Sequence, residues 1–145
     1  PLICVVKNWK HLEMSFKIKI LVCDDDLTAR ILMKETLSSE FVEVLEAENG
    51  QRAVELFETH HPSLILLDVS MPKMNGFEVC EHIRGHEKGK HIPVIMVTGS
   101  DDIDSIHKSY AVGATDFIAK PIKWPILGQR VKYILRASQA FEDLV

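Results

Sequence analysis

The chain has 145 residues, of which 46% are hydrophobic and 26% are charged. This length suits one domain with a core large enough to fold without disulfides, and the hydrophobic share excludes a wholly disordered chain. The net charge of −4 disfavours binding to a nucleic-acid backbone, and no apolar run approaches the roughly 20 residues of a membrane helix. We therefore expect no direct nucleic-acid partner and no membrane partner.

The cysteines and the first residues bear on location and domain limits. Cys4, Cys23 and Cys80 have no metal-binding spacing, and the apolar patterns around Cys23 and Cys80 predict buried thiols. An odd number of such thiols favours a reducing compartment, so we expect a cytoplasmic protein. No signal peptide is recognisable, and residues 1–16 are interpreted as an N-terminal extension or an expression remnant.

Short apolar runs alternate with helical patterns from Lys17 onward. The runs predict five strands, at residues 18–23, 42–45, 64–67, 94–97 and 117–119. Apolar residues at helical spacing predict five helices, at residues 27–38, 51–59, 76–85 and 101–112 and from Pro125 onward. Strands that alternate with crossover helices indicate a single α/β domain with a five-stranded parallel sheet.

Polar side chains follow four of these strands at the point where each strand ends. Asp24–Asp26 follow the first strand, Asp68 the third, Thr98 the fourth and Lys120 the fifth. Ligands of open parallel sheets bind beyond the carboxyl ends of the strands, so we expect one site to collect these residues.

The residue types at this edge indicate phosphoryl chemistry with a metal ion. Converging carboxylates repel one another unless a cation neutralises them, and oxygen ligands suit Mg²⁺, so Asp24, Asp25 and Asp68 form a candidate magnesium site. A carboxylate beside a divalent cation can attack phosphorus, which makes Asp68 a candidate nucleophile. Lys120 could then pair with the phosphoryl charge and the Thr98 hydroxyl could donate to a phosphoryl oxygen.

Four segments resemble, in order and spacing, the motifs of the receiver domain of two-component response regulators. They are ILVCDDD, LILLDVSMPKMNGFEV, IPVIMVTG and GATDFIAKPI, and the resemblance covers residues 17–137. It implies a doubly wound, flavodoxin-like (βα)5 fold with strand order 2-1-3-4-5. It also implies a phosphoacceptor signalling domain, with Mg²⁺-dependent self-phosphorylation and slow autodephosphorylation but no enzymatic turnover.

The resemblance assigns roles to individual residues. Asp68 would be the phosphoacceptor for a sensor histidine kinase or phosphotransfer protein. Asp24 and Asp25 would hold Mg²⁺ together with Asp68 and the backbone carbonyl of Ser70.

Other residues would detect the phosphoryl group. Lys120 would pair with it, through a cis bond to Pro121, and Thr98 would move toward it. Phe117 would follow as the switch aromatic. This would remodel the surface of the fourth helix, fifth strand and fifth helix, through which the domain could also form a homodimer.

An alternative from the enzyme class also has support. The run from Asp24 to Thr28 fits the Asp-x-Asp-x-Thr motif of haloacid-dehalogenase-like phosphatases, which would use Asp24 and Asp26. That assignment leaves Asp68 without a role, and Asp26 is also a candidate helix cap. Steady turnover of a phosphomonoester would favour the phosphatase, whereas a single stoichiometric phosphorylation would favour the receiver.

The last helix suggests a continuation of the chain. Residues 138–145 are interpreted as the start of a linker helix to an output domain C-terminal to Val145. Residues 123–138 resemble receivers that are fused to a diguanylate cyclase or a cyclic-di-GMP phosphodiesterase.

Overall fold

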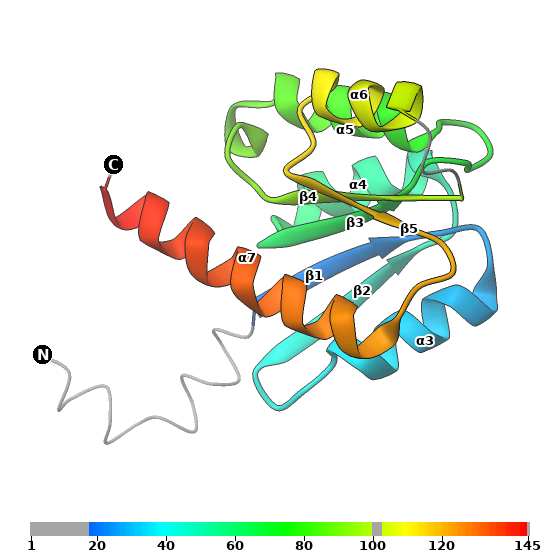
Figure 1. Ribbon diagram of the computed structural model, residues 1–145. Helices are drawn as coiled ribbons and strands as arrows, with labels where there is room; N and C mark the ends of the chain where they lie inside the picture. The colour runs from blue at the N-terminus through cyan, green and yellow to red at the C-terminus, as the bar shows by residue number, and fades with distance from the viewer. Residues whose placement is uncertain (1–17, 100–102, 145) are drawn as a thin grey trace, which may run out of the picture.

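A computed structural model describes residues 18–99 and 103–144, with side chains described as far as Gln139. The predictions for residues 1–16, Cys4 included, lie outside this part of the chain. Figure 1 shows a central sheet with α3 and α7 on one face and α4, α5 and α6 on the other.

All neighbouring strands of the sheet run parallel, in the order β2-β1-β3-β4-β5. This confirms the order 2-1-3-4-5 and the flavodoxin-like α/β fold. The strands are β1 (Ile18–Cys23), β2 (Val42–Ala47), β3 (Leu64–Asp68), β4 (Val94–Thr98) and β5 (Asp116–Ala119).

In the part of the chain that the structure describes, five α-helices and one short 3₁₀ helix connect and follow the strands. They are α3 (Leu27–Leu37), α4 (Gly50–His60), α5 (Gly76–Gly85), η1 (Glu87–Gly89), α6 (Ile103–Ala111) and α7 (Trp124–Leu144). Three of the α-helices begin at a side-chain cap, at Asp26, Asn49 and Asn75. Each cap oxygen accepts a hydrogen bond from a backbone N–H of the first turn, which that turn cannot satisfy internally.

The core is divided by the sheet into two apolar layers. Phe57 of α4 and Ile83 of α5 belong to one layer, and Met33 of α3 and Leu127 of α7 belong to the other. Because β1, β3 and β4 are covered on both faces, their sequences are nearly continuous in Val, Ile and Leu. Cys23 and Cys80 are free and buried, as predicted.

Within residues 18–99 and 103–144, no helix is both long and apolar enough to cross a bilayer.

The contact between α5 and the end of β3 depends on a glycine. A Cβ atom at Gly76 would overlap the backbone carbonyl of Asp68, whereas one at Gly85 would meet no atom within 4 Å. We expect Gly76→Ala to lower the free energy of unfolding by about 1–3 kcal/mol, because the added methyl must displace backbone. Gly85→Ala, at the other end of α5, is the matched control and should be neutral or stabilising by up to about 1 kcal/mol. Urea unfolding measures both, and equal losses would contradict the packing argument.

Candidate phosphoacceptor and metal site

Three carboxylates meet at the carboxyl edge of the sheet. Oxygen atoms of Asp24, Asp25 and Asp68 all lie within 4.8 Å of one another. The strand order produces this cluster, because β1 and β3 are neighbours and deliver their following residues to the same edge. Asp24 and Asp68 are buried, and Asp25 is exposed. The set offers oxygen ligands with one side open to solvent, as a hydrated Mg²⁺ ion requires.

Asp24 is held in position by the chain around it. Its Oδ1 accepts a hydrogen bond from the Asp26 N–H at 2.9 Å, and its backbone carbonyl accepts one from Arg30 Nη1 at 2.8 Å. Arg30 also pairs with Glu46 at 3.4 Å, which fixes the guanidinium between α3 and β2. The carboxylate of Asp24 is therefore held by its own loop, and its backbone is held by the neighbouring helix.

Asp26 has a different structural role from Asp24 and Asp25. Its Oδ1 accepts a hydrogen bond from the Thr28 N–H at 3.1 Å, so it caps α3 as predicted. The phosphatase alternative needs Asp24 and Asp26 to act as a catalytic pair. Asp68, which that alternative leaves unused, lies in the carboxylate cluster instead.

Lys120 connects the two buried acids. Its Nζ lies 3.4 Å from Asp24 Oδ2 and 3.4 Å from Asp68 Oδ1. Partial burial alone would lower the pKa of Lys120, but the carboxylates of Asp68 and Asp24 outweigh it and raise the pKa above its ordinary value. Lys120 therefore stays charged beside Asp68. Its bond to Pro121 is cis, as the resemblance implied.

The surroundings of Asp68 favour its neutral form. Burial, and then the charge of Asp24, raise the pKa of Asp68 from 3.8 to about 6, against the opposing effects of Lys120 and the Ser70 N–H. One lysine therefore does not compensate for two buried carboxylates at one edge. A second cation in the cluster would relieve the remaining repulsion.

The other predicted site residues lie nearby but differ in their surroundings. Thr98 ends β4 and is buried, and its backbone carbonyl accepts a hydrogen bond from the Lys120 N–H at 2.7 Å. Ser70 is exposed, and its N–H donates to Asp68 Oδ1 at 3.5 Å. Phe117 lies in β5, three residues before Lys120, and is half-buried.

Sequence reasoning missed the partners of Phe117. The rings of Phe117 and Tyr110 pack nearly perpendicular, with their centroids 6.1 Å apart, and the Phe117 carbonyl accepts a hydrogen bond from Arg130 Nη1 at 3.0 Å. Tyr110 belongs to α6 and Arg130 to α7, so Phe117 joins both helices to the edge strand. Helical periodicity predicts the two helices but not which of their residues face β5.

Comparison with known proteins agrees with this geometry. Residues 20–132 match the response regulator receiver domain family. The chain is 37% identical to the "Probable transcriptional regulator ycf27" of Cyanophora paradoxa, over 85% of the chain and 50% of that protein. It is 35% identical to the "Response regulator PleD" of Caulobacter vibrioides, over 87% of the chain and 28% of that protein. Among solved structures, the chemotaxis protein CheY4 of Vibrio cholerae has a TM-score of 0.77 and 29% identity, over 81% of the chain and 98% of that protein.

The chain spans about half the length of several of the curated relatives that it matches. The family match covers most of the chain, and the sheet order and the acidic cluster are those that the resemblance implied. The chain belongs to the response regulator receiver domain family, the phosphoacceptor modules of two-component signalling, which are signalling domains and not turnover enzymes.

Proposed function

We propose that Asp68 is the phosphoacceptor and takes a phosphoryl group from a phosphohistidine of a sensor histidine kinase or a phosphotransfer protein. A carboxylate oxygen of Asp68 attacks phosphorus, the P–N bond breaks, and the imidazole leaves with the electron pair of that bond and takes up a proton. The product is an acyl phosphate on Asp68. The observation that carries this proposal is the convergence of Asp24, Asp25 and Asp68 within 4.8 Å, with Lys120 3.4 Å from both buried acids.

The proposal includes a Mg²⁺ ion held by Asp24, Asp25, Asp68 and the backbone carbonyl of Ser70. The fit rests on the all-oxygen donor set and on the uncompensated charge that raises the pKa of Asp68. When bound, Mg²⁺ supplies positive charge that offsets the charge on the phosphoryl oxygens. Lys120 would move its ammonium from the carboxylates toward the phosphoryl group, a short movement because Nζ already contacts Asp68.

The output of phosphorylation in this proposal is a changed surface. Thr98 is drawn toward the phosphoryl group, and Phe117 adjusts against α6 and α7, which it already contacts. Large apolar side chains are exposed on these helices, which favours a protein partner or a homodimer there. They are Ile103, Tyr110, Ile126 and Tyr133.

We further propose that residues 17–137 are the receiver domain, that residues 138–145 begin a linker to an output domain, and that residues 1–16 are an N-terminal extension or an expression remnant. Helix α7 continues unbroken to Leu144, which supports a helical linker. The proposed output is a diguanylate cyclase or a cyclic-di-GMP phosphodiesterase. Two buried free thiols, Cys23 and Cys80, suit a reducing cytoplasm.

Acetyl phosphate tests the proposed chemistry without the kinase. We expect the chain to gain one phosphoryl group per molecule in the presence of Mg²⁺ and none when EDTA removes the metal, because the carboxylate cluster repels the donor when no metal offsets its charge. Intact-mass spectrometry measures the gain. Continuous hydrolysis of p-nitrophenyl phosphate, without a stable phosphorylated form, would contradict the proposal and favour the phosphatase alternative.

A further inference from the structure

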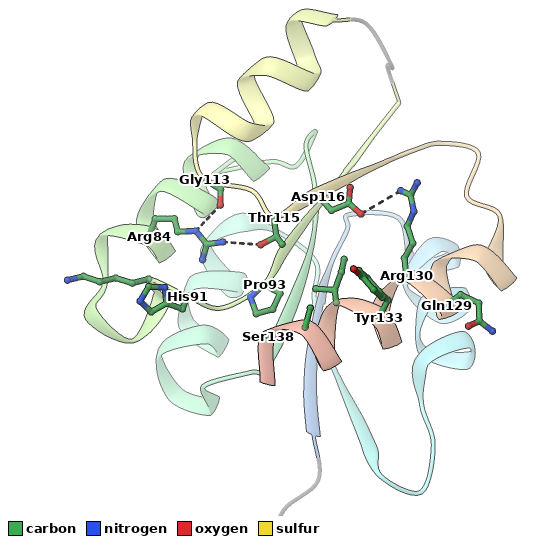
Figure 2. Close-up of a pocket in the computed structure, with 13 residues that line it drawn as sticks. Arg84, His91, Pro93, Gly113, Thr115, Asp116, Gln129, Arg130, Tyr133 and Ser138 are labelled. Carbon is green, nitrogen blue, oxygen red and sulfur yellow. Dashed lines mark hydrogen bonds and ion pairs between the residues drawn. The ribbon is translucent and has the colours of Figure 1, made fainter. Parts of the chain in front are cut away.

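A second candidate site lies at the amino ends of the strands, opposite the carboxylate cluster. A pocket of about 860 Å³ is walled by the loops that precede β4 and β5 and by α7 (Figure 2). Small-molecule sites commonly measure roughly 300–1,000 Å³, so this pocket has a suitable size. Pro93 lines it at the start of β4, whereas Thr98 ends that strand, roughly 16 Å away at strand spacing. The pocket is therefore separate from the phosphoacceptor site.

The pocket is rich in basic side chains in a chain that is acidic overall. Arg84, Lys90, His91 and Arg130 line it, and Asp116 is the one carboxylate among the lining residues that the structure describes. Asp116 is already engaged, because its Oδ2 lies 3.7 Å from Arg130 Nη1. The chain carries a net charge of −4, so the positive charge here is a local feature. A pocket of this kind attracts anions.

Arg84 is fixed in the wall by neutral groups. It donates to the carbonyl oxygens of Gly89, Ile92 and Gly113 at 2.8, 2.6 and 2.8 Å, and to Thr115 Oγ1 at 3.4 Å. Among the described residues, no carboxylate forms an ion pair with it. Its place in the last turn of α5 is favourable for a cation in any protein, so Arg84 alone would indicate only a structural role.

Two further residues complete a recognition surface. Lys90 lies beyond the helix, is exposed, and has no ion pair in the part of the chain that the structure describes. Tyr133 of α7 lines the pocket from the facing wall, although 71% of its surface is exposed. Figure 2 shows Arg84 and His91 on one side of the pocket and Tyr133 and Ser138 on the other. A phosphate suits the basic wall, and a planar base can stack on a tyrosine ring.

We propose that this pocket binds a nucleotide-class ligand, a small molecule that carries phosphate and a planar ring. The phosphate lies against Arg84 and Lys90, and the ring stacks on Tyr133. The Ser138 hydroxyl, which also lines the pocket, can contact the sugar or the base.

Isothermal titration calorimetry of the whole chain tests this site, with ADP and inorganic pyrophosphate as probes. The buffer contains EDTA, so that metal-bridged binding at Asp68 does not contribute. We expect saturable binding of ADP, and pyrophosphate should bind at least about fivefold more weakly because it lacks the stacking ring. Equal affinities, or no saturation at millimolar ADP, would overturn the proposal.

Single substitutions test what each wall of the pocket contributes to binding. Lys90→Gln should weaken ADP and pyrophosphate alike, by roughly threefold to tenfold. Tyr133→Ala should weaken ADP alone. Lys132→Gln removes the same charge from an exposed residue that does not line the pocket, and it should change neither affinity. A similar loss in Lys132→Gln would indicate nonspecific attraction and overturn the site.

ADP binding at this pocket should not depend on Asp68, the proposed phosphoacceptor. Asp68→Asn should retain full ADP affinity, since the pocket lies at the other end of β4. Loss of ADP binding in that variant would place the ligand at the acidic edge and overturn this inference.

Discussion

Replacing Asp68 with Asn should reduce Mg²⁺-dependent phosphorylation by acetyl phosphate to background. The amide has nearly the shape of the carboxylate but lacks the nucleophilic oxygen, and it weakens the metal site by one charge. Burial and the charge of Asp24 raise the pKa of Asp68 from 3.8 to about 6. Intact-mass spectrometry after incubation with acetyl phosphate should therefore find the variant unmodified under conditions that phosphorylate the wild-type chain.

The matched control is Asp104→Asn. Asp104 lies in the first turn of α6 and is exposed, so this change removes the same charge away from the cluster. The control should be phosphorylated to the wild-type extent. Undiminished labelling of Asp68→Asn would show that another group accepts the phosphoryl, and mapping the modification to Asp24 would revive the phosphatase alternative.

The architecture and the acidic edge were predictable because they depend on local patterns. Runs such as Leu64–Leu67 are too apolar for a half-exposed strand, and each is followed by a polar residue at the point where the chain leaves the sheet. Parallel strands bring such ends to one edge whatever the side-chain details. The polar residues of the site could therefore be gathered from sequence before any geometry was known.

Boundaries and long-range partners were less predictable. The second strand extends to Ala47, two residues past its predicted end, because Glu46 and Ala47 pair with Val22 and Cys23 of β1. The charged residue Glu46 interrupts the apolar pattern of β2, so the sequence does not indicate the extension. In the structure its carboxylate pairs with Arg30. Strand pairing, not local apolarity, decides where β2 ends.

The basic pocket was not predicted at all. Arg84 donates hydrogen bonds to the carbonyl oxygens of Gly89, Ile92 and Gly113, the last of them 29 positions further along the chain. Lys90 and Tyr133 are more than 40 positions apart in the sequence and line the same pocket because α7 packs against the sheet. Such a juxtaposition has no local signature, whereas a run of three aspartates at a strand end does.

Asp68→Asn should stabilise the fold even though it abolishes phosphorylation. In metal-free buffer near neutral pH, we expect Asp68→Asn to raise the free energy of unfolding by up to about 3 kcal/mol. Burial and Asp24 raise the pKa of Asp68 from 3.8 to about 6, so the folded wild-type chain must hold an ionised carboxylate in a place that favours the neutral form. A shift of this size corresponds to about 3 kcal/mol, and the neutral amide avoids that cost.

The stabilising effect of Asp68→Asn should depend on pH. The folded state binds the Asp68 proton more tightly than the unfolded state, so this contribution to stability is full below pH 3.8 and is lost as the pH rises through about 6. Urea unfolding at several pH values should show the advantage of Asp68→Asn growing between about pH 4 and pH 6 and then levelling off. Mg²⁺ at neutral pH should narrow the gap, since it stabilises the ionised cluster of the wild-type chain. Asp104→Asn should show no such trend, and an Asp68→Asn variant that is less stable than the wild type at neutral pH would refute the electrostatic account of this site.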